Sequence, residues 1–130
     1  PTSVVHVAKA LADMGCHEVG LADTIGAATP EQIEIVLDAV LQELPVGLLS
    51  GHYHDTNGRA LENIEVSLEK GIRLFDSAIG GLGGCPYAPG ATGNVATEAV
   101  VDRVTKLGHN TGLNFEKLLD VAVFARGLSG

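Results

Sequence analysis

The feature that most constrains the fold of this chain is the alternation of short apolar strands with amphipathic helices. Strands are expected at about 18–22, 46–54 and 72–79, and helices at about 3–14, 30–44 and 59–70. Strands that alternate with helices of about 10–15 residues form right-handed βαβ units around a parallel sheet. The pattern therefore predicts the α/β fold class.

The helix expected at 30–44 has the clearest start and stop signals. Thr29 suits the N-cap position, Pro30 suits the first helical position, and Gln32 would complete a capping box. Pro45 ends the helix because it cannot continue the backbone hydrogen bonds. Between these limits the apolar residues recur with a helical period, at Ile33, Val36, Leu37, Val40, Leu41 and Leu44.

Three strands are too few to close a barrel. A barrel of eight strands and eight helices typically needs about 250 residues, whereas this chain has 130. We therefore interpret residues 1–130 as one partial (β/α)8 TIM-barrel domain of about three βα units, comprising strands six to eight and the outer helices. Two further helices are expected after the third strand, the first at about 97–107. A small, complete open-sheet domain is the alternative.

Composition argues against several classes of partner. The net charge is −8, which disfavours nucleic acid and anionic membranes as partners. No apolar run approaches the roughly 18 residues of a membrane span.

Cys16 and Cys85 do not have the spacing of a disulfide framework, which favours a reduced, intracellular setting. Residues 1–3 resemble the entry to a helix and no signal peptide is recognisable, so the natural N-terminus is expected to lie upstream.

A pair of histidines ends the second expected strand, at the edge where α/β barrels carry their active sites. His52 and His54 are two residues apart, so their side chains leave the same face of the strand. They can hold a divalent metal, although a surface or hydrogen-bonded pair is the common alternative. Asn94 suits a helix N-cap, but its amide oxygen is also a hard, neutral ligand. Nitrogen and oxygen ligands without a thiolate favour Mg²⁺ or Mn²⁺ over structural zinc.

Other candidates follow the first and third strands. Cys85 lies in a glycine-rich loop where a thiol can approach a substrate, and a nearby cation would lower its pKa; a lone cysteine also fits a structural role. Asp23 is either a cap of the following turn or a carboxylate directed at a substrate hydroxyl or a metal-bound water. Asp76 points into the barrel or is a satisfied polar core residue. The glycines form no dinucleotide fingerprint, because no G-x-G-x-x-G opens a helix.

Three segments carry a family resemblance: 23–26 (DTIG), 52–56 (HYHDT) and 81–98 (GLGGCPYAPGATGNVATE). Together they resemble the hydroxymethylglutaryl-CoA lyase family, and the match continues through 107–119 to cover most of the chain. The H-x-H-D element is shared with a wider metal-dependent barrel superfamily that includes isopropylmalate, homocitrate and citramalate synthases. The cysteine loop is far more specific to the lyase.

The resemblance implies metal-assisted retro-Claisen cleavage of 3-hydroxy-3-methylglutaryl-CoA to acetyl-CoA and acetoacetate. It implies that His52, His54 and Asn94 ligate Mg²⁺ or Mn²⁺. It also implies that Cys85 is the catalytic thiol and that Asp23 is an active-site acid. Cys85 would protonate the departing enolate, with His52 or Asp23 as the proton relay. The expected partner is an acyl-CoA substrate. The full-length enzyme is expected to be a homodimer, cytoplasmic in a bacterium and in the mitochondrial matrix in a eukaryote.

One part of the family pattern is missing from this sequence. The family's remaining metal ligand is an Asp preceded by an Arg at the end of the first barrel strand, and this chain contains no Arg-Asp pair. The metal site and substrate pocket of this chain alone are therefore expected to be incomplete, and the chain alone inactive. Two alternatives remain: a Claisen-condensing acyltransferase acting on 2-oxo acids, and a non-catalytic half-barrel.

Overall fold

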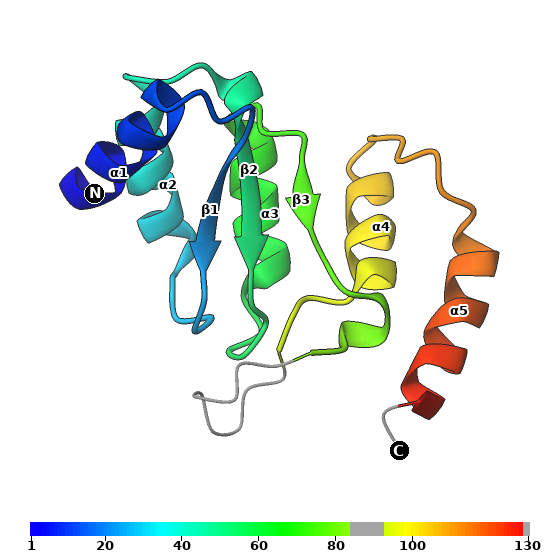
Figure 1. The fold of residues 1–130 in the computed structure, drawn as a ribbon. Helices are drawn as coiled ribbons and strands as arrows, with labels where there is room; N and C mark the ends of the chain where they lie inside the picture. Colours follow the sequence, from blue (N-terminus) through cyan, green and yellow to red (C-terminus); the bar gives the residue numbers. More distant parts are fainter. Residues whose placement is uncertain (84–92, 129–130) are drawn as a thin grey trace.

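A three-stranded parallel sheet and five α-helices make up the computed structural model, which describes residues 1–83 and 93–128 (Figure 1). The strands are β1 (Val19–Asp23), β2 (Leu49–Tyr53) and β3 (Phe75–Asp76). The helices are α1 (Thr2–Asp13), α2 (Pro30–Leu41), α3 (Ala60–Glu69), α4 (Thr97–Lys106) and α5 (Phe115–Leu128). Two 3₁₀ turns, η1 (Val46–Leu48) and η2 (Ile79–Gly81), complete the order.

The sheet confirms the predicted βα topology. The strand order is β1-β2-β3, and both pairings are parallel. Along β1, Val19 is buried while Gly20 and Ala22 are exposed, so the helices cover one face of the sheet. In a (β/α)8 barrel, parallel strands form the inner ring and the helices cover only its outer face. The described residues have the arrangement expected of an arc of such a barrel.

Helix α2 begins as its sequence predicts. The Thr29 hydroxyl accepts the backbone N–H of Gln32, and the Gln32 side chain accepts the backbone N–H of Thr29 at 3.0 Å. Because Pro30 has no N–H, this helix start leaves three N–H groups unpaired, and two of them are thereby satisfied. The helix ends at Leu41, and a further turn carries the chain to Pro45.

Two of the strand predictions were wrong in extent. The segment expected as a strand at 46–54 opens with η1, because the N–H of Leu48 turns back to the carbonyl of Pro45 at 3.1 Å. The strand expected at 72–79 is only two residues long. Beyond it, Ala78 pairs with Ala96 in a parallel bridge and donates to the Val95 carbonyl at 3.0 Å. The chain therefore leaves β2 to pair with the segment before α4.

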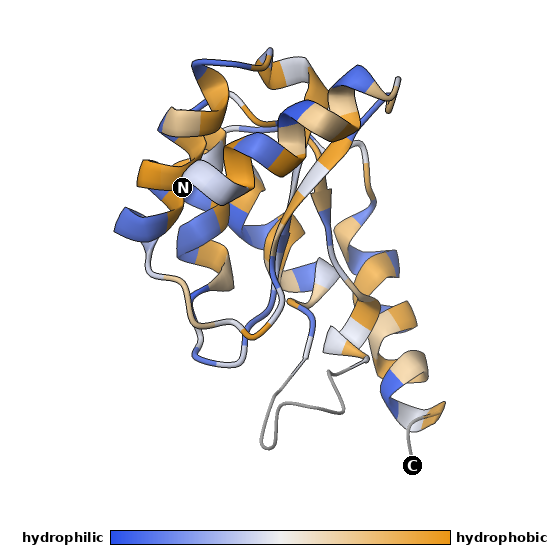
Figure 2. Cartoon of the chain, turned by 60° about the vertical axis from the view of Figure 1, so that its left-hand side comes forward, coloured by the Kyte–Doolittle hydropathy of each residue, from blue (hydrophilic) through white to orange (hydrophobic). Residues whose placement is uncertain are grey.

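The core lies between the sheet and its helices and contains two apolar clusters. One is centred on Tyr53, Ile64, Leu68, Val95 and Val104, and the other on Val19, Leu37, Val40, Leu49 and Ile72. Ile33 and Phe75 pack against both clusters and join them into one layer. Figure 2 shows hydrophobic and hydrophilic residues alternating around the helices, as this packing requires.

A buried carboxylate connects the last two helices to the end of the sheet. Glu98, only 7% exposed, accepts the N–H of Gly80 at 2.9 Å and pairs with Arg126 at 2.6 Å. It thus joins η2, α4 and α5.

Across the residues that the structure describes, no helix is both long and apolar enough to cross a bilayer.

Candidate metal centre

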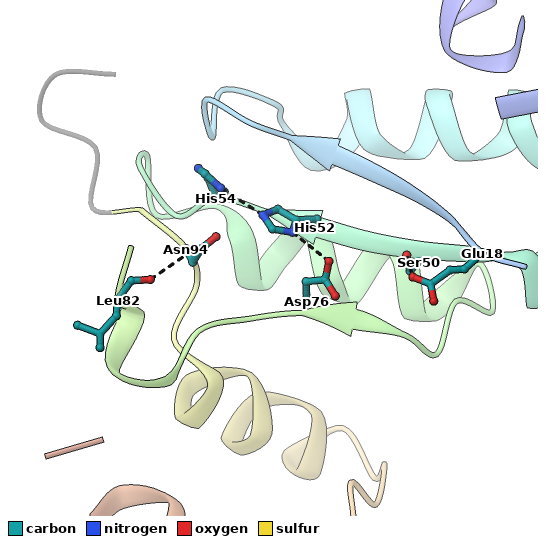
Figure 3. Close-up of polar contacts among 7 residues, drawn as sticks. All are labelled: Glu18, Ser50, His52, His54, Asp76, Leu82 and Asn94. Carbon is teal, nitrogen blue, oxygen red and sulfur yellow. Dashed lines mark hydrogen bonds and ion pairs between the residues drawn. The ribbon is translucent and has the colours of Figure 1, made fainter. Parts of the chain in front are cut away.

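His52 and His54 lie where β2 ends and face Asn94 across a short backbone bridge (Figure 3). His52 is the next-to-last residue of β2 and stands in register between Ala22 of β1 and Asp76 of β3. His54 follows the strand and forms an antiparallel bridge with Asn94. The fold therefore brings the three predicted ligands to one place at the C-terminal edge of the sheet.

The two imidazoles approach each other through their Nε2 atoms. The Nε2–Nε2 distance is 3.3 Å, and the ring centroids are 5.3 Å apart with a tilt of 41°. Two facing imidazole nitrogens at this separation need a proton or a cation between them, because both lone pairs would otherwise repel. An octahedral ion with ligands at about 2.1 Å would hold two neighbouring nitrogens about 3 Å apart. The pair therefore fits either a shared proton or one small divalent ion.

Asn94 is anchored by hydrogen bonds that its side-chain and backbone nitrogen atoms donate, and its side-chain oxygen takes no part in them. Its Nδ2 donates to the carbonyl of Leu82 at 3.2 Å, and its backbone N–H donates to the carbonyl of Gly83 at 3.2 Å. Figure 3 shows the Asn94 oxygen directed away from Leu82. Gly83 has φ +83°, and a Cβ there would lie 3.1 Å from Asn94 Nδ2. A glycine is therefore required beside this amide.

The alternative role for Asn94, an N-cap of α4, is not what the structure shows. The residue at the N-cap is Ala96, and no side-chain cap hydrogen bond is present there. Within residues 1–83 and 93–128, no group of three or more His, Cys, Asp or Glu side chains is arranged to hold a metal. The Asn94 amide oxygen stays the predicted third ligand, and an oxygen of this kind matches the hard-oxygen preference of Mg²⁺ and Mn²⁺.

Asp23 is placed in the first turn rather than with the histidines. Its two carboxylate oxygens accept the backbone N–H groups of Ala27 at 3.2 Å and Ala28 at 2.9 Å. Asp23 is in register with Tyr53, one residue beyond His52, and neighbouring strand residues point to opposite faces. The turn-cap interpretation is the one that the structure shows. A direct chemical role for Asp23 stays a prediction.

Tyr53 separates the two histidines in sequence and points to the helix side. Its hydroxyl is 2.7 Å from the Ser67 hydroxyl, and the side chain is 2% exposed. Burial raises the pKa of Tyr53, the hydrogen bond with Ser67 opposes that shift, and the charge of Asp23 adds to it. Tyr53 is thus a neutral core residue that anchors β2 to α3.

The turn after β1 is fixed by side chains from the segment after β2. Asn57 Nδ2 donates to the Gly26 carbonyl at 2.8 Å, and Asn63 Nδ2 donates to the Ala28 carbonyl at 3.2 Å. Gly26 has φ +65°, and a Cβ there would lie 2.9 Å from the carbonyl oxygen of His54. Close packing of this turn therefore sets the position of the backbone at His54.

One contact of the histidine pair, with Asp76, was not predicted from the sequence. Asp76 Oδ2 lies 3.1 Å from His52 Nδ1, a contact that depends on the strand register and has no signature in local sequence. Cys85 lies outside the described residues. The nearest described positions on either side of it are Gly83 and Gly93.

Comparison with known proteins places this geometry in a family. The HMGL-like family model matches residues 1–124. The chain belongs to the HMGL-like family. It is 52% identical to rat mitochondrial hydroxymethylglutaryl-CoA lyase over 124 residues, which is 95% of this chain and 38% of that protein. The chain therefore spans less than half the length of this curated HMGL-like relative.

Solved HMGL-like structures agree with the fold. The HMG-CoA lyase from Brucella melitensis superposes with a TM-score of 0.93 at 54% identity, covering 97% of this chain and 44% of that one. The HMG-CoA lyase from Acinetobacter baumannii, in complex with coenzyme A and 3-methylmalate, gives a TM-score of 0.86 at 37% identity, with 93% and 40% covered. These matches confirm the partial barrel and disfavour the small, complete open-sheet domain.

Proposed function

We propose that this chain forms strands six to eight of a barrel lyase that cleaves 3-hydroxy-3-methylglutaryl-CoA to acetyl-CoA and acetoacetate. The family match over residues 1–124 supports the reaction class. The single structural observation that carries the proposal is the facing pair of imidazole Nε2 atoms, 3.3 Å apart, at the edge of the sheet where barrels place their chemistry. A non-catalytic half-barrel would not require this arrangement.

His52, His54 and Asn94 would hold a Mg²⁺ or Mn²⁺ ion. Their donors are two imidazole nitrogens and one amide oxygen, which suit these ions. The ion supplies Lewis acidity, which favours loss of the proton from the substrate hydroxyl. A further ligand is needed from outside this chain, as the resemblance also implies. The rest of the barrel would provide it together with the other half of the acyl-CoA pocket.

The remaining chemistry needs a proton acceptor and a proton donor. The substrate's tertiary hydroxyl loses its proton, the carbon–carbon bond breaks, acetoacetate forms, and the electron pair departs with the enolate of acetyl-CoA. The Cys85 thiol would protonate that enolate carbon. His52 or Asp23 would serve as the proton relay; both oxygens of Asp23 also accept backbone hydrogen bonds in the turn. The full-length enzyme would be a homodimer, in the bacterial cytoplasm or the mitochondrial matrix according to its source.

The test is a pair of cysteine variants in the full-length protein that carries this chain. Cys85→Ser should lower kcat for acetoacetate formation by about 10²–10⁴-fold, because a hydroxyl is a far weaker acid than a thiol. Its Mn²⁺ affinity should stay unchanged. Cys16→Ser is the matched control, since Cys16 is exposed and precedes β1 at the opposite end of the strand from Asp23. Full activity in Cys85→Ser would return Cys85 to a structural role.

A further inference from the structure

The only carboxylate hydrogen-bonded to His52 among the described residues is Asp76, and the sheet register places it there. His52 and Asp76 are paired residues of β2 and β3, so their side chains rise from the same face of adjacent strands. Asp76 Oδ2 lies 3.1 Å from His52 Nδ1, while His52 Nε2 faces His54 (Figure 3). The imidazole of His52 is thus held at both ends of its ring.

This contact decides which nitrogen of His52 can act as a ligand. A carboxylate accepts hydrogen bonds and does not donate them, so Nδ1 must carry the proton in the pair with Asp76. In a neutral ring the lone pair is then on Nε2, the atom directed at His54. We propose that Asp76 is a positioning residue of the metal centre, which fixes the tautomer and orientation of His52; this inference rests on the proposed function.

The two histidines differ in this respect. Nδ1 of His54 is buried and has no hydrogen-bond partner within the part of the chain that the structure describes. Its ring is held by its surroundings, since the residue is 9% exposed. The side chain of His52 is 36% exposed, and burial alone does not orient it. His52 is therefore the ligand that needs an orienting partner, and Asp76 supplies one.

The Asp76–His52 pair contributes little to the stability of the fold. The Asp76 side chain is 60% exposed, and solvent-exposed pairs of this kind contribute little to folding because water screens them. Carboxylates that hold the second nitrogen of a ligating histidine instead raise its basicity and fix its direction. Removing Asp76 should therefore change metal binding far more than it changes the melting temperature.

The register that creates the pair depends on a glycine. Gly51 is paired with Phe75, one residue before His52 and Asp76. A Cβ on Gly51 would lie 3.0 Å from the Phe75 ring and 2.9 Å from the Tyr53 ring. The absence of a side chain lets the Phe75 ring pack against β2, and this packing holds the two-residue strand β3 in the register that pairs His52 with Asp76.

The experiment measures Mn²⁺ affinity of the full-length protein by isothermal titration and by the electron paramagnetic resonance signal of free Mn²⁺. Asp76→Ala should weaken binding by about 10–100-fold, with an unchanged melting temperature of the metal-free protein. Asp76→Glu, which keeps an acceptor, should restore most of the affinity. Asp102→Asn is the control, because Asp102 is a solvent-side residue of α4 paired with Lys106. If Asp76→Ala does not fold, Asp76→Val also removes the acceptor, carries a side chain that suits a strand, and gives the same comparison.

A spectroscopic readout separates positioning from a structural role. In the metal-free protein labelled with [¹⁵N]histidine, at a pH where the imidazole is neutral, His52 should show the Nδ1–H tautomer. Asp76→Ala should shift it toward a mixture. Wild-type affinity and an unchanged tautomer in Asp76→Ala would overturn the inference while leaving the proposed function intact. A wild-type protein that fails to bind Mn²⁺ would instead contradict the proposed function itself.

Discussion

Two turns at the same edge of the sheet differ in how their polar atoms are used. In the turn after β1, both carboxylate oxygens of Asp23 accept backbone N–H groups, and the carbonyls of Gly26 and Ala28 accept side-chain amides. At the end of β2, the two histidines direct Nε2 atoms at each other. The first turn satisfies its polar atoms internally, whereas the second presents nitrogen atoms that need a proton or cation between them.

The difference shows how the C-terminal edge of the sheet can combine a rigid turn after β1 with a metal-binding site at the end of β2. The first turn supports the second directly, since a Cβ on Gly26 would lie 2.9 Å from the His54 carbonyl. The amide of His54 also donates to the Asp23 carbonyl at 3.3 Å. A satisfied polar network of this kind fixes the backbone, and ligand geometry needs such support. Changes in the first turn should therefore affect stability, and changes at the histidines should affect metal binding.

The largest effect is expected at His54. In the full-length protein, His54→Ala should weaken Mn²⁺ binding by more than about 100-fold, because it removes a ligand rather than a residue that supports one. Titration calorimetry measures this directly. His17→Ala is the control, since His17 is exposed and lies before β1. Equal affinities in the two variants would remove His54 from the metal centre.

Asp23→Ala tests the other side of the comparison. It should lower the free energy of unfolding by about 1–3 kcal/mol, because the N–H groups of Ala27 and Ala28 lose their partners. The Mn²⁺ affinity should change little. Denaturant unfolding and metal titration on the same preparations report both quantities. A large loss of affinity with unchanged stability would place Asp23 among the metal-site residues and break the distinction between the two turns.

Gly51→Ala tests whether the register between β2 and β3 affects both stability and Mn²⁺ affinity. The added methyl group would overlap the rings of Tyr53 and Phe75, and overpacking of this kind costs about 1–3 kcal/mol of stability. Some loss of Mn²⁺ affinity should accompany it through His52. Gly47→Ala is the matched control, because a Cβ there meets nothing within 4 Å. Similar melting temperatures in the two variants would show that β3 tolerates the shift.

The smallest effect is expected at Tyr53. Tyr53→Phe removes the hydrogen bond with Ser67 and should cost about 0.5–1.5 kcal/mol near neutral pH. Burial raises the pKa of Tyr53, so the folded state retains this proton longer than the unfolded state. The resulting stability is fully present below the unfolded pKa of about 10 and is lost as pH rises above it. Unfolding curves from pH 8 to 11 should therefore show a steeper alkaline loss in wild type than in Tyr53→Phe.

Sequence was informative where structure depends on near neighbours. The capping box at Thr29 and the strand–helix alternation follow from local spacing, and the structure confirms both. The length of β3 did not follow, because it ends where Ala78 pairs with Ala96, 18 residues away along the chain. The same limit applies to the Asp76–His52 contact, which depends on register between strands.

The polar residues show which features could be predicted from local sequence and which could not. The H-x-H spacing was enough to place both histidines at the strand end, since alternation along a strand is local. The role of Asp23 depended on whether its turn folds back far enough to supply N–H donors, which spacing does not reveal. Glu98 had no distinguishing pattern, because its partner Arg126 lies on another helix.

Pulsed electron paramagnetic resonance of Mn²⁺ bound to the full-length protein tests the central claim most directly. The account predicts electron spin-echo modulation from two imidazole nitrogens, reduced to one in His52→Ala and in His54→Ala. Asp23→Ala should retain both couplings, since Asp23 serves the turn. Bound Mn²⁺ without nitrogen coupling, or with couplings that survive both histidine substitutions, would show that the metal lies elsewhere and that the facing imidazoles share only a proton.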